Sequence, residues 1–330
     1  MKAVLCKSLE GPQALVVEEI ASAEPGPGEV RLSVRAAALN FFDTLITRGK
    51  YQTKPELPFS PSGEVAGIVD AVGAGVTGIE PGQRYQAYLG YGGARVQVVL
   101  EPWRLVAIPD GVSDEVAAGV SITYGTAIHG LKDRARLQAG EWVAVLVSAG
   151  GAGRSAVEIS RLMGARVIAV AAGEDKLATC RAAGAEVTID YSSGDLKEAL
   201  RAATGGAGVD VVYDCVGGAH AEPALRAIAW GGRFLVVGFA SGEIPRLALN
   251  LLLLKGAAAI GVFWGEAVRR DPAGHRANMA AVLNWVAQGR LDPVIHARYP
   301  LELVREAIGE IESRRARGKV VLTMGPPDGA

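Results

Sequence analysis

The chain has 330 residues, 49% of them hydrophobic, and a net charge of −1 at neutral pH. That length suggests two domains with sizeable cores, and the balanced charge gives no footprint for nucleic acid or an anionic membrane surface. The three cysteines are too few for a disulfide scaffold, no signal peptide is recognisable, and polar residues interrupt the apolar region 247–264, so we expect a cytoplasmic protein without a membrane span.

The first 115 residues have a β-rich pattern. Short strands are predicted at 15–19, 30–37 and 65–72, and clusters of glycine and proline mark the turns between them. Short strands punctuated in this way are typical of a compact antiparallel barrel. Ser113 or Asp114 then caps a predicted helix, and strands and helices alternate from there on.

Residues 142–170 carry a strand, a turn of small residues, a helix and a second strand. The strands are the apolar runs 142–147 and 166–170. The helical face is formed by Ala152, Ala156, Ile159 and Met163. A strand, glycine turn, helix and strand within about thirty residues predict a parallel crossover unit.

The turn at 148–153 is predicted to bind the pyrophosphate of a dinucleotide. A helix N-terminus offers unpaired N–H groups and partial positive charge, and Gly150 leaves the approach to them open. Gly153 lets the helix pack closely on the strand. Because Ser148 replaces the first glycine of the usual motif, the same turn is also compatible with an unrelated α/β protein. The predicted contacts are Ser148, Ala149, Gly150, Gly151, Ala152 and Gly153.

The end of the second strand indicates which dinucleotide binds. NAD sites usually place a carboxylate about 20 residues on, but that position holds Ala171, Ala172 and Gly173. Lys176 follows in the first turn of the next helix, where its charge suits a 2′-phosphate, so we predict NADPH. The alternative is that Lys176 is a solvated helix lysine and Glu174 takes the acidic role.

The remaining chain continues the alternation and then leaves it. Strands predicted at 186–189, 209–214, 233–237 and 257–262, with helices at 174–183, 195–203 and 219–229 between them, indicate a doubly wound parallel sheet. The tail departs from this series, with helices at 276–288 and 303–312 and a strand at 319–323, so we expect the chain to return to the first domain.

Several motifs occur together in a fixed order along nearly the full length. They are Ala-Leu-Asn-Phe-Phe-Asp at 38–43, Gly-Lys-Tyr at 49–51, Pro-Phe at 58–59, Gly-Glu-Val-Ala-Gly at 63–67, Thr-Tyr-Gly-Thr at 123–126, Asp-Val-Val-Tyr-Asp at 210–214, Gly-Gly-Arg-Phe-Leu-Val-Val-Gly-Phe at 231–239 and Arg-Gly-Lys-Val-Val-Leu at 317–322. With the glycine turn, this ordered set resembles the zinc-independent quinone oxidoreductase branch of the medium-chain dehydrogenase/reductase superfamily.

The resemblance implies an α/β fold in which a Rossmann doubly wound parallel sheet accompanies a discontinuous GroES-like β-barrel catalytic domain. The catalytic domain would comprise 1–117 and 267–330, and the Rossmann NADPH-binding domain 118–266, with the active cleft between them. The family is usually dimeric, so we expect a homodimer, to which the apolar stretch 247–254 contributes unless it is simply core.

The resemblance also bears on metals. The alcohol dehydrogenases of the superfamily bind zinc through a cysteine near position 43 and a Gly-His-Glu near 62–64, together with a four-cysteine lobe. Asp43 and Ser62-Gly63-Glu64 occupy those places here, and residues 84–110 contain no cysteine. We therefore predict neither a catalytic nor a structural zinc.

The candidates for hydrogen bonds to the substrate are Asn40, Asp43, Tyr51 and Thr123, and Asp43 is equally compatible with a local cap or ion pair. By resemblance, Asn40 and Tyr51 face the nicotinamide or substrate, where an amide or hydroxyl donates to a developing oxyanion, and Thr123 lies beneath the nicotinamide. The alternative is ordinary turn, strand and helix chemistry at each position. The further cofactor contacts that the resemblance implies are Thr126, Gly173, Lys176, Tyr191, Gly238, Phe239, Val262, Phe263 and Arg314, of which Val262 and Phe263 are equally compatible with a core strand.

The predicted function is NADPH-dependent reduction of a quinone without zinc. Quinones and other conjugated carbonyls spread the incoming negative charge themselves, so they need no Lewis acid. The alternative is an NADPH-dependent 2-enoyl reductase that acts on alkenals or short acyl-CoA thioesters. An acyl-CoA site needs basic residues at the cleft mouth, for which Arg48 and Lys50 are candidates that are equally compatible with solvated loop charges. A third reading is a non-catalytic NADPH-binding protein.

Overall fold

The computed structural model describes residues 1–313 and 316–325, and the chain divides into two compact units. The first comprises Met1–Ile122 and Ala267–Ala330, and the second comprises Thr123–Glu266. The chain crosses from one unit to the other within helix α2 (Asp114–Ile128) and returns within α8 (Trp264–Arg270). The predicted domain boundaries, 1–117 with 267–330 and 118–266, stay a prediction.

The second unit is built on a six-stranded sheet in which all neighbouring strands are parallel. The order β10-β9-β8-β11-β12-β13 is that of a doubly wound dinucleotide-binding sheet, so the predicted fold class is confirmed. The strands are β8 (Trp142–Leu146), β9 (Arg166–Ala171), β10 (Val187–Asp190), β11 (Val209–Asp214), β12 (Ile228–Val236) and β13 (Ala258–Gly261).

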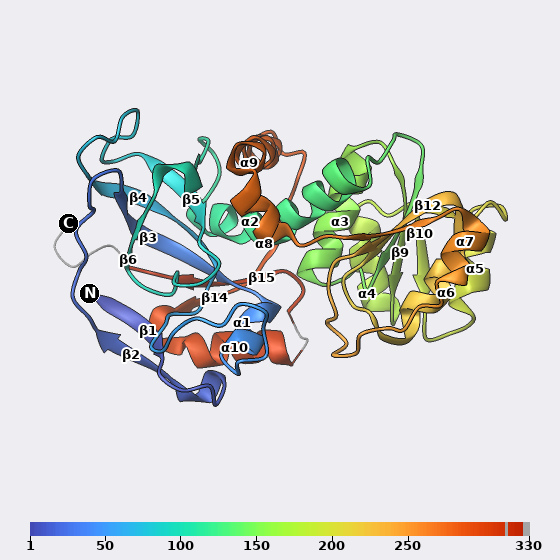
Figure 1. Ribbon diagram of the computed structural model, residues 1–330, viewed down its shortest axis with the longest axis horizontal. Helices are drawn as coiled ribbons and strands as arrows, with labels where there is room; N and C mark the ends of the chain where they lie inside the picture. The colour runs from blue at the N-terminus through green and yellow to red at the C-terminus, as the bar shows by residue number, and fades with distance from the viewer. Residues whose placement is uncertain (314–315, 326–330) are drawn as a thin grey trace. The chain divides into compact units, whose positions relative to one another are not determined.

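Helices cover both faces of this sheet, and Figure 1 shows α3 and α4 on one face and α5, α6 and α7 on the other. Because both faces are covered, the central strands are mostly apolar, and Val143–Leu146 within β8 are all fully buried. The helices are α3 (Gly151–Leu162), α4 (Glu174–Ala182), α5 (Leu196–Ala203), α6 (Ala221–Arg226) and α7 (Asn250–Lys255).

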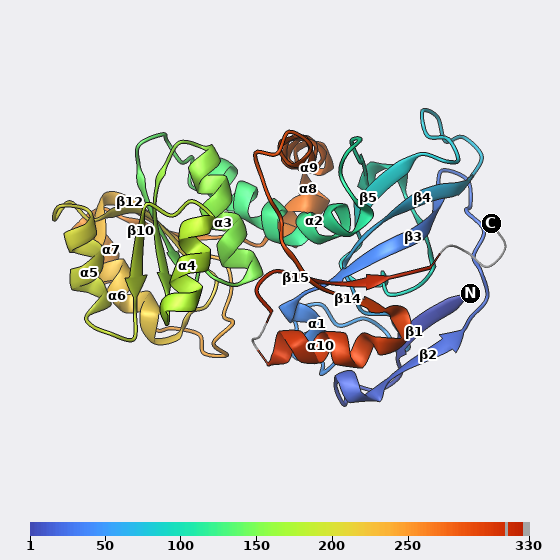
Figure 2. The same ribbon diagram turned by 180° about the vertical axis from the view of Figure 1, so that it is seen from behind.

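The first unit is a mostly antiparallel sheet in the order β14-β15-β3-β4-β5-β7, with β6 also pairing β3. The C-terminal β15 pairs antiparallel with β3, so the tail completes the sheet that the first residues begin (Figure 2). A hairpin of β1 (Lys2–Cys6) and β2 (Leu15–Glu19) lies outside this order. The sheet strands are β3 (Val30–Leu39), β4 (Glu64–Val72), β5 (Arg84–Tyr88), β6 (Gln97–Leu100), β7 (Leu105–Ala107), β14 (Ile295–Pro300) and β15 (Lys319–Thr323).

Two helices of the first unit pack together, α1 (Phe41–Ile46) and α10 (Val304–Glu312), and a longer one, α9 (Pro272–Ala287), contacts β7. Apolar residues of α1, α10 and the facing strands form one core cluster. In the part of the chain that the structure describes, no helix combines the length and the hydropathy that crossing a bilayer requires.

The structure corrects one predicted helix. The expected helix 219–229 is split into a 3₁₀ turn (Gly218–His220) and α6, and β12 begins at Ile228 rather than near residue 233. Gly217 and Gly218 both have positive φ, which breaks the helical path before α6.

Candidate functional site

The glycine turn of the second unit follows β8 directly. Val147 has a left-handed φ of 53°, and α3 begins at Gly151 with Gly150 as its N-cap. The backbone N–H and the hydroxyl of Ser148 both donate to the carbonyl of Val170, at 3.0 and 3.1 Å. The turn is thereby tied to the neighbouring strand β9.

Two glycines of the turn have different roles. A Cβ at Gly153 would lie 2.5 Å from Cα of Ser148, so only glycine permits this approach of α3 to the turn. A Cβ at Gly150 would meet nothing within 4 Å, so the approach to the first N–H groups of α3 is open. This open cradle at a helix N-terminus fits a dinucleotide pyrophosphate.

Thr123 of α2 lies beside this cradle. The methyl group of Thr123 would be 3.7 Å from a Cβ on Gly151, and its carbonyl accepts a hydrogen bond from Ser155 of α3 at 3.0 Å. Thr123 is buried and Thr126, one helical turn on, is half-buried. The structure therefore brings Thr123 and the glycine turn together, and both belong to the second unit.

The start of α4 carries Glu174 and Lys176, the two residues considered as contacts for the ribose 2′-hydroxyl or 2′-phosphate of the cofactor. Gly173 has a φ of 82° and is the N-cap of α4. Glu174 forms an ion pair with Arg181, whereas Lys176 is exposed and has no ion-pair partner among residues 1–313 and 316–325. Asp190, at the end of β10, accepts a hydrogen bond from the N–H of Gly173 at 3.1 Å, and bonds to Ser192 lower its pKa.

Three predicted cofactor contacts come after strand ends: Tyr191 follows β10, and Gly238 and Phe239 follow β12. The ring of Tyr191 packs on that of His220, with centroids 4.3 Å apart. The N–H of Gly238 donates to the carbonyl of Asp214 at 3.3 Å, and the Phe239 ring lies 2.9 Å from the position a Cβ on Gly217 would take.

Three predicted contacts remain near or beyond the end of β13. Val262 is buried and donates its N–H to the carbonyl of Val236 at 2.9 Å. These contacts are those expected if Val262 belongs to a core strand. Phe263 is 59% exposed, so its ring is accessible. Arg314 lies outside the described residues.

The first unit holds a buried polar cluster around Asn40, which precedes α1. The Asn40 Nδ2 donates to Oε1 of Glu64 at 2.8 Å, and its Oδ1 accepts from Nζ of Lys319 at 2.6 Å. Lys319 also donates to Oε1 of Glu64 at 2.6 Å. The strand pairing of β15 with β3 and of β3 with β4 brings these three residues together from distant parts of the chain.

Asp43 forms the other side of this cluster. Its carboxylate accepts the backbone N–H groups of Asn40 and Ser62, both at 2.8 Å, in the manner of a helix capping box. Complete burial raises the pKa of Asp43 to about 7, although those two hydrogen bonds and the charge of Lys319 act to lower it.

Tyr51 lies near the same cluster. Its ring packs against that of Phe42, with centroids 5.3 Å apart. Burial, and then the nearby charge of Asp43, raise the pKa of the Tyr51 phenol, so it stays protonated at neutral pH. Asn40 and Tyr51 thus supply a side-chain amide and a neutral hydroxyl in one region of the first unit.

Glu64 and Lys319 were not predicted as functional residues. Lys319 appears in the sequence as the first residue of an apolar strand, with no local signal that it meets Asn40 279 residues away. Asp43 and the segment Ser62-Gly63-Glu64, which the resemblance aligns with the zinc motifs of the superfamily, lie in this cluster, and the carboxylates of Asp43 and Glu64 bond to groups of this chain. Across the described ranges, no set of three or more His, Cys, Asp or Glu residues is arranged to hold a metal ion.

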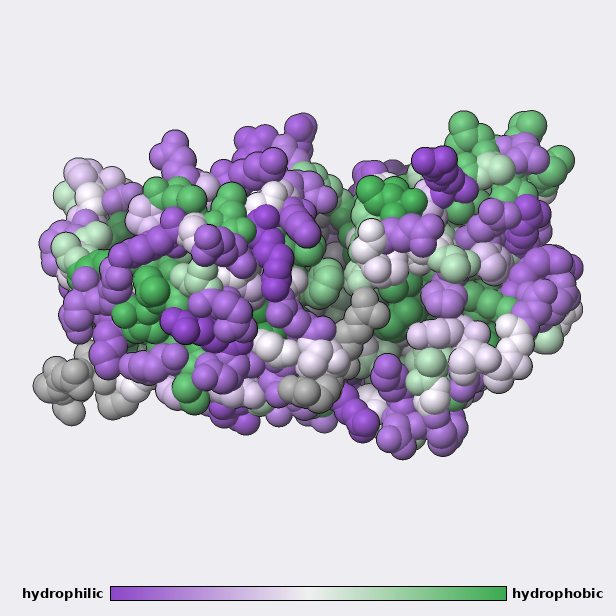
Figure 3. Space-filling view, turned by 90° about the horizontal axis from the view of Figure 1, so that it is seen from below, coloured by the Kyte–Doolittle hydropathy of each residue, from purple (hydrophilic) through white to green (hydrophobic). Residues whose placement is uncertain are grey.

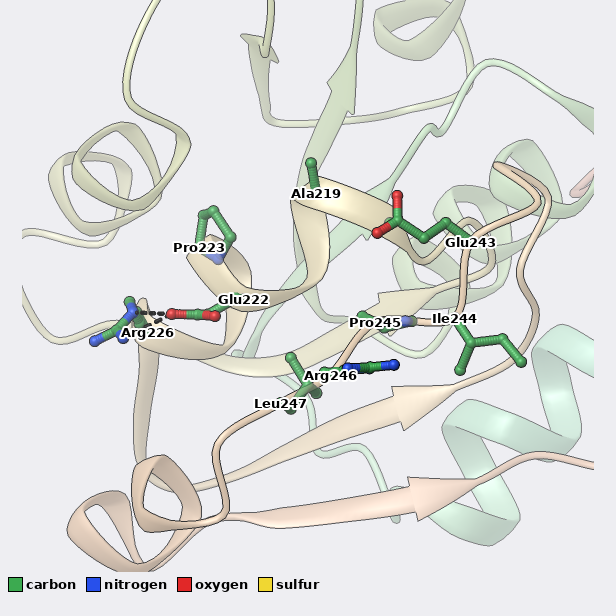
Figure 4. A pocket seen from close by; sticks show the side chains of 10 residues that line it. Ala219, Glu222, Pro223, Arg226, Glu243, Ile244, Pro245, Arg246 and Leu247 are labelled. Carbon is green, nitrogen blue, oxygen red and sulfur yellow. Dashed lines mark hydrogen bonds and ion pairs between the residues drawn. The ribbon is translucent and has the colours of Figure 1, made fainter.

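A surface cavity of about 720 Å³ lies elsewhere in the second unit. Figure 4 shows the Glu222–Arg226 ion pair on one wall and Glu243 and Arg246 on the other. Its lining contains none of the predicted site residues among those described. The lining residues are Gly218, Ala219, Glu222, Pro223, Arg226, Glu243, Ile244, Pro245, Arg246 and Leu247.

Known proteins resemble the chain over almost its whole length. Residues 151–288 match the zinc-binding dehydrogenase family and residues 26–110 match the alcohol dehydrogenase GroES-like domain. The chain is 37% identical to quinone oxidoreductase-like protein 2 of Rattus norvegicus, over 98% of this chain and 92% of the rat protein. It is 33% identical to a quinone oxidoreductase of Pseudomonas aeruginosa, over 94% of this chain and 96% of that protein.

A solved structure extends the likeness to three dimensions. The Escherichia coli quinone oxidoreductase, crystallised in complex with NADPH, superposes with a TM-score of 0.89 at 27% identity, covering 98% of this chain and 100% of that one. A nicotinamide cofactor therefore binds to this fold.

Proposed function

Because the chain belongs to the quinone-oxidoreductase-like branch of the medium-chain dehydrogenase/reductase superfamily, we propose that it is an NADPH-dependent quinone reductase that works without zinc. The observation that carries the proposal is the buried cluster of the first unit. There Asp43 and Glu64, which lie in the segments that the resemblance aligns with the superfamily's zinc motifs, are bonded to groups of this chain, while the amide of Asn40 provides a hydrogen-bond donor.

The proposed reaction reduces an acceptor that is conjugated to a carbonyl. The bound nicotinamide supplies the hydride. As the hydride adds to the acceptor, an electron pair moves onto the acceptor oxygen, and an amide N–H of Asn40 donates to the negative charge that develops there. Tyr51 is the second donor, since its raised pKa keeps the phenol protonated. Solvent supplies the proton that completes the product.

The glycine cradle and Lys176 support the choice of cofactor. The open approach at Gly150 suits the pyrophosphate, and the exposed ammonium of Lys176 suits a 2′-phosphate. Glu174 is already paired with Arg181, which argues against the alternative in which it bonds a ribose hydroxyl. Arg314, the second proposed phosphate contact, rests on the resemblance alone.

The test is cofactor oxidation by the purified protein against a panel of quinones, alkenals and enoyl-CoA thioesters. We expect the quinones to be reduced fastest, with NADPH favoured over NADH at low cofactor concentration. Faster turnover of alkenals or enoyl-CoAs would assign a 2-enoyl reductase instead. Cofactor binding without turnover of any acceptor would make the protein a non-catalytic binder.

Metal content is measured on the same preparation. We expect well under one zinc per chain and activity that survives a chelator. Activity that disappears on chelation and returns with added metal would contradict the zinc-free proposal.

A further inference from the structure

The side-chain amide of Asn40 lies between two opposite charges. Its oxygen accepts from the ammonium of Lys319 at 2.6 Å, and its nitrogen donates to the carboxylate of Glu64 at 2.8 Å. The two ends of such an amide have nearly the same shape, so the neighbouring groups decide which way it is turned. In the reverse orientation the amide NH₂ would face an ammonium and the amide oxygen would face a carboxylate, and both contacts would be repulsive.

The two charged residues are themselves held in place. Glu64 accepts from Lys319 at 2.6 Å through Oε1 and from the backbone N–H of Ile122 at 2.7 Å through Oε2. The side chains of Lys319 and Glu64 are 6% and 0% exposed. Water therefore has little access to screen the pair, and the charges that Asn40 meets are fixed in position.

One hydrogen of the Asn40 amide remains available. The Nδ2 atom carries two hydrogens and donates one to Glu64, and the described residues offer no second acceptor. Asn40 keeps 9% of its surface exposed, whereas Glu64 has none. Asn40 is therefore accessible from solvent, whereas Glu64 is not.

We propose that Lys319 and Glu64 are positioning residues which fix the polarity of the Asn40 amide, so that it presents an N–H donor and not a carbonyl acceptor to the substrate. The inference rests on the proposed function, in which Asn40 meets the acceptor oxygen. It assigns the substrate class as compounds that offer an oxygen lone pair at this point and gain negative charge there, as quinones and enones do. An aspartate at position 40 would instead place another carboxylate beside Glu64.

The kinetic test removes the charges and restores one of them. K319M removes the ammonium, and K319M/E64Q removes both charges together, so that no buried ion is left unpaired. We expect either variant to lower kcat for quinones by about tenfold or more while the KM for NADPH changes less than about twofold, and K319R to recover most of the loss. K2M is the matched control, because Lys2 forms an exposed ion pair with Glu302 in the same unit, and its kcat should equal that of the wild type.

A double-mutant cycle separates positioning from plain stabilisation. If Lys319 acts through Asn40, then N40A/K319M is no slower than N40A alone, within about twofold. Losses that add in the double variant would overturn the proposal, and so would a K319R variant as slow as K319M.

A second measurement is independent of turnover. The ¹⁵N-labelled side-chain amide of Asn40 is identified in NMR spectra as the pair of signals that N40A lacks. We expect one strongly shifted, exchange-protected hydrogen in the wild type and loss of that pattern in K319M/E64Q. An unchanged pair in K319M/E64Q would refute the polarity assignment, even if the wild type reduced no acceptor and the proposed function had failed.

Discussion

At the start of α4, Glu174 and Lys176 lie two residues apart, and they differ in whether their charges are already paired. Glu174 is bound to Arg181, whereas Lys176 is exposed with no ion pair in the described part of the chain. The carboxylate of Asp190 also points at this region, but it accepts hydrogen bonds from Gly173 and Ser192. The unpaired positive charge here is therefore that of Lys176.

Substitution of Lys176 by methionine tests whether this charge meets a 2′-phosphate. An exposed charge pair contributes about 1 kcal/mol, so K176M should raise the KM for NADPH roughly fivefold and leave that for NADH nearly unchanged. Steady-state kinetics with both cofactors provide the measurement. K197M is the control, since Lys197 is another exposed lysine of the same unit, and equal effects of K176M on both cofactors would refute the role.

Lys319 illustrates which residues the sequence analysis could not identify. The places of the glycine turn and of Lys176 in the fold were predictable because a local pattern of strand, turn and helix determines them, while their roles in cofactor binding stay predictions. The role of Lys319 arises only when β15 pairs with β3, which brings Val320 opposite Leu39. Such a contact depends on tertiary pairing, and no periodicity within either strand indicates it. Asp190 was missed for the same reason, because its bond to Gly173 joins two neighbouring parallel strands.

At the scale of elements, the close approach of α3 to the β8 turn depends on one glycine. The position of a Cβ on Gly153 would also be 2.7 Å from the carbonyl oxygen of Val147, so backbone atoms and not a flexible side chain would have to move. Gly150, one residue before α3, has an ordinary φ of −81° and open space around it. Gly153 is therefore required for packing, whereas Gly150 keeps the approach for a ligand open.

Alanine substitutions distinguish those two requirements. G153A should lower the free energy of unfolding by about 1–3 kcal/mol through overpacking. The better helix propensity of alanine offsets part of this loss. G150A should melt close to the wild type but bind NADPH more weakly, because its methyl group lies on the open approach. Thermal melting and fluorescence titration measure the two effects. Equal melting temperatures for the two variants would contradict this reading of the turn.

The elements best predicted are those with a continuous local pattern. β11 and β15 have the predicted bounds, since each short run contains three β-branched residues and is bounded by polar or glycine residues. The split of 219–229 was missed because the helix formers there follow two glycines with positive φ, Gly217 and Gly218, which lie against the loop 239–245, where the N–H of Gly218 donates to the carbonyl of Glu243. Those contacts join segments that no local window contains.

At the scale of the whole molecule, the second unit exposes an apolar surface beside its last strand. Leu249, Leu253 and Leu254 are 77%, 79% and 68% exposed, and Trp230 is 80% exposed and packs beside Gly256. Among the strands of the described residues, β13 pairs with β12 alone and is therefore an edge strand. Figure 3 shows hydrophobic side chains reaching the surface of this unit. Edge strands with exposed apolar neighbours are sites of association between chains, which favours the predicted homodimer.

Replacement of Leu253 by glutamate tests whether this surface, formed by Trp230, Leu249, Leu253 and Leu254, joins two copies. A charge buried in an apolar interface is poorly compensated, so L253E should weaken the dimer by about tenfold or more and yield monomers at micromolar concentration. Sedimentation velocity over a concentration series measures the shift. L303E is the control, because Leu303 is an exposed leucine of the first unit, whereas α7 and β13 belong to the second. The prediction is wrong if the wild type stays monomeric at the highest concentration. It is also wrong if the L253E variant dimerises like the wild type.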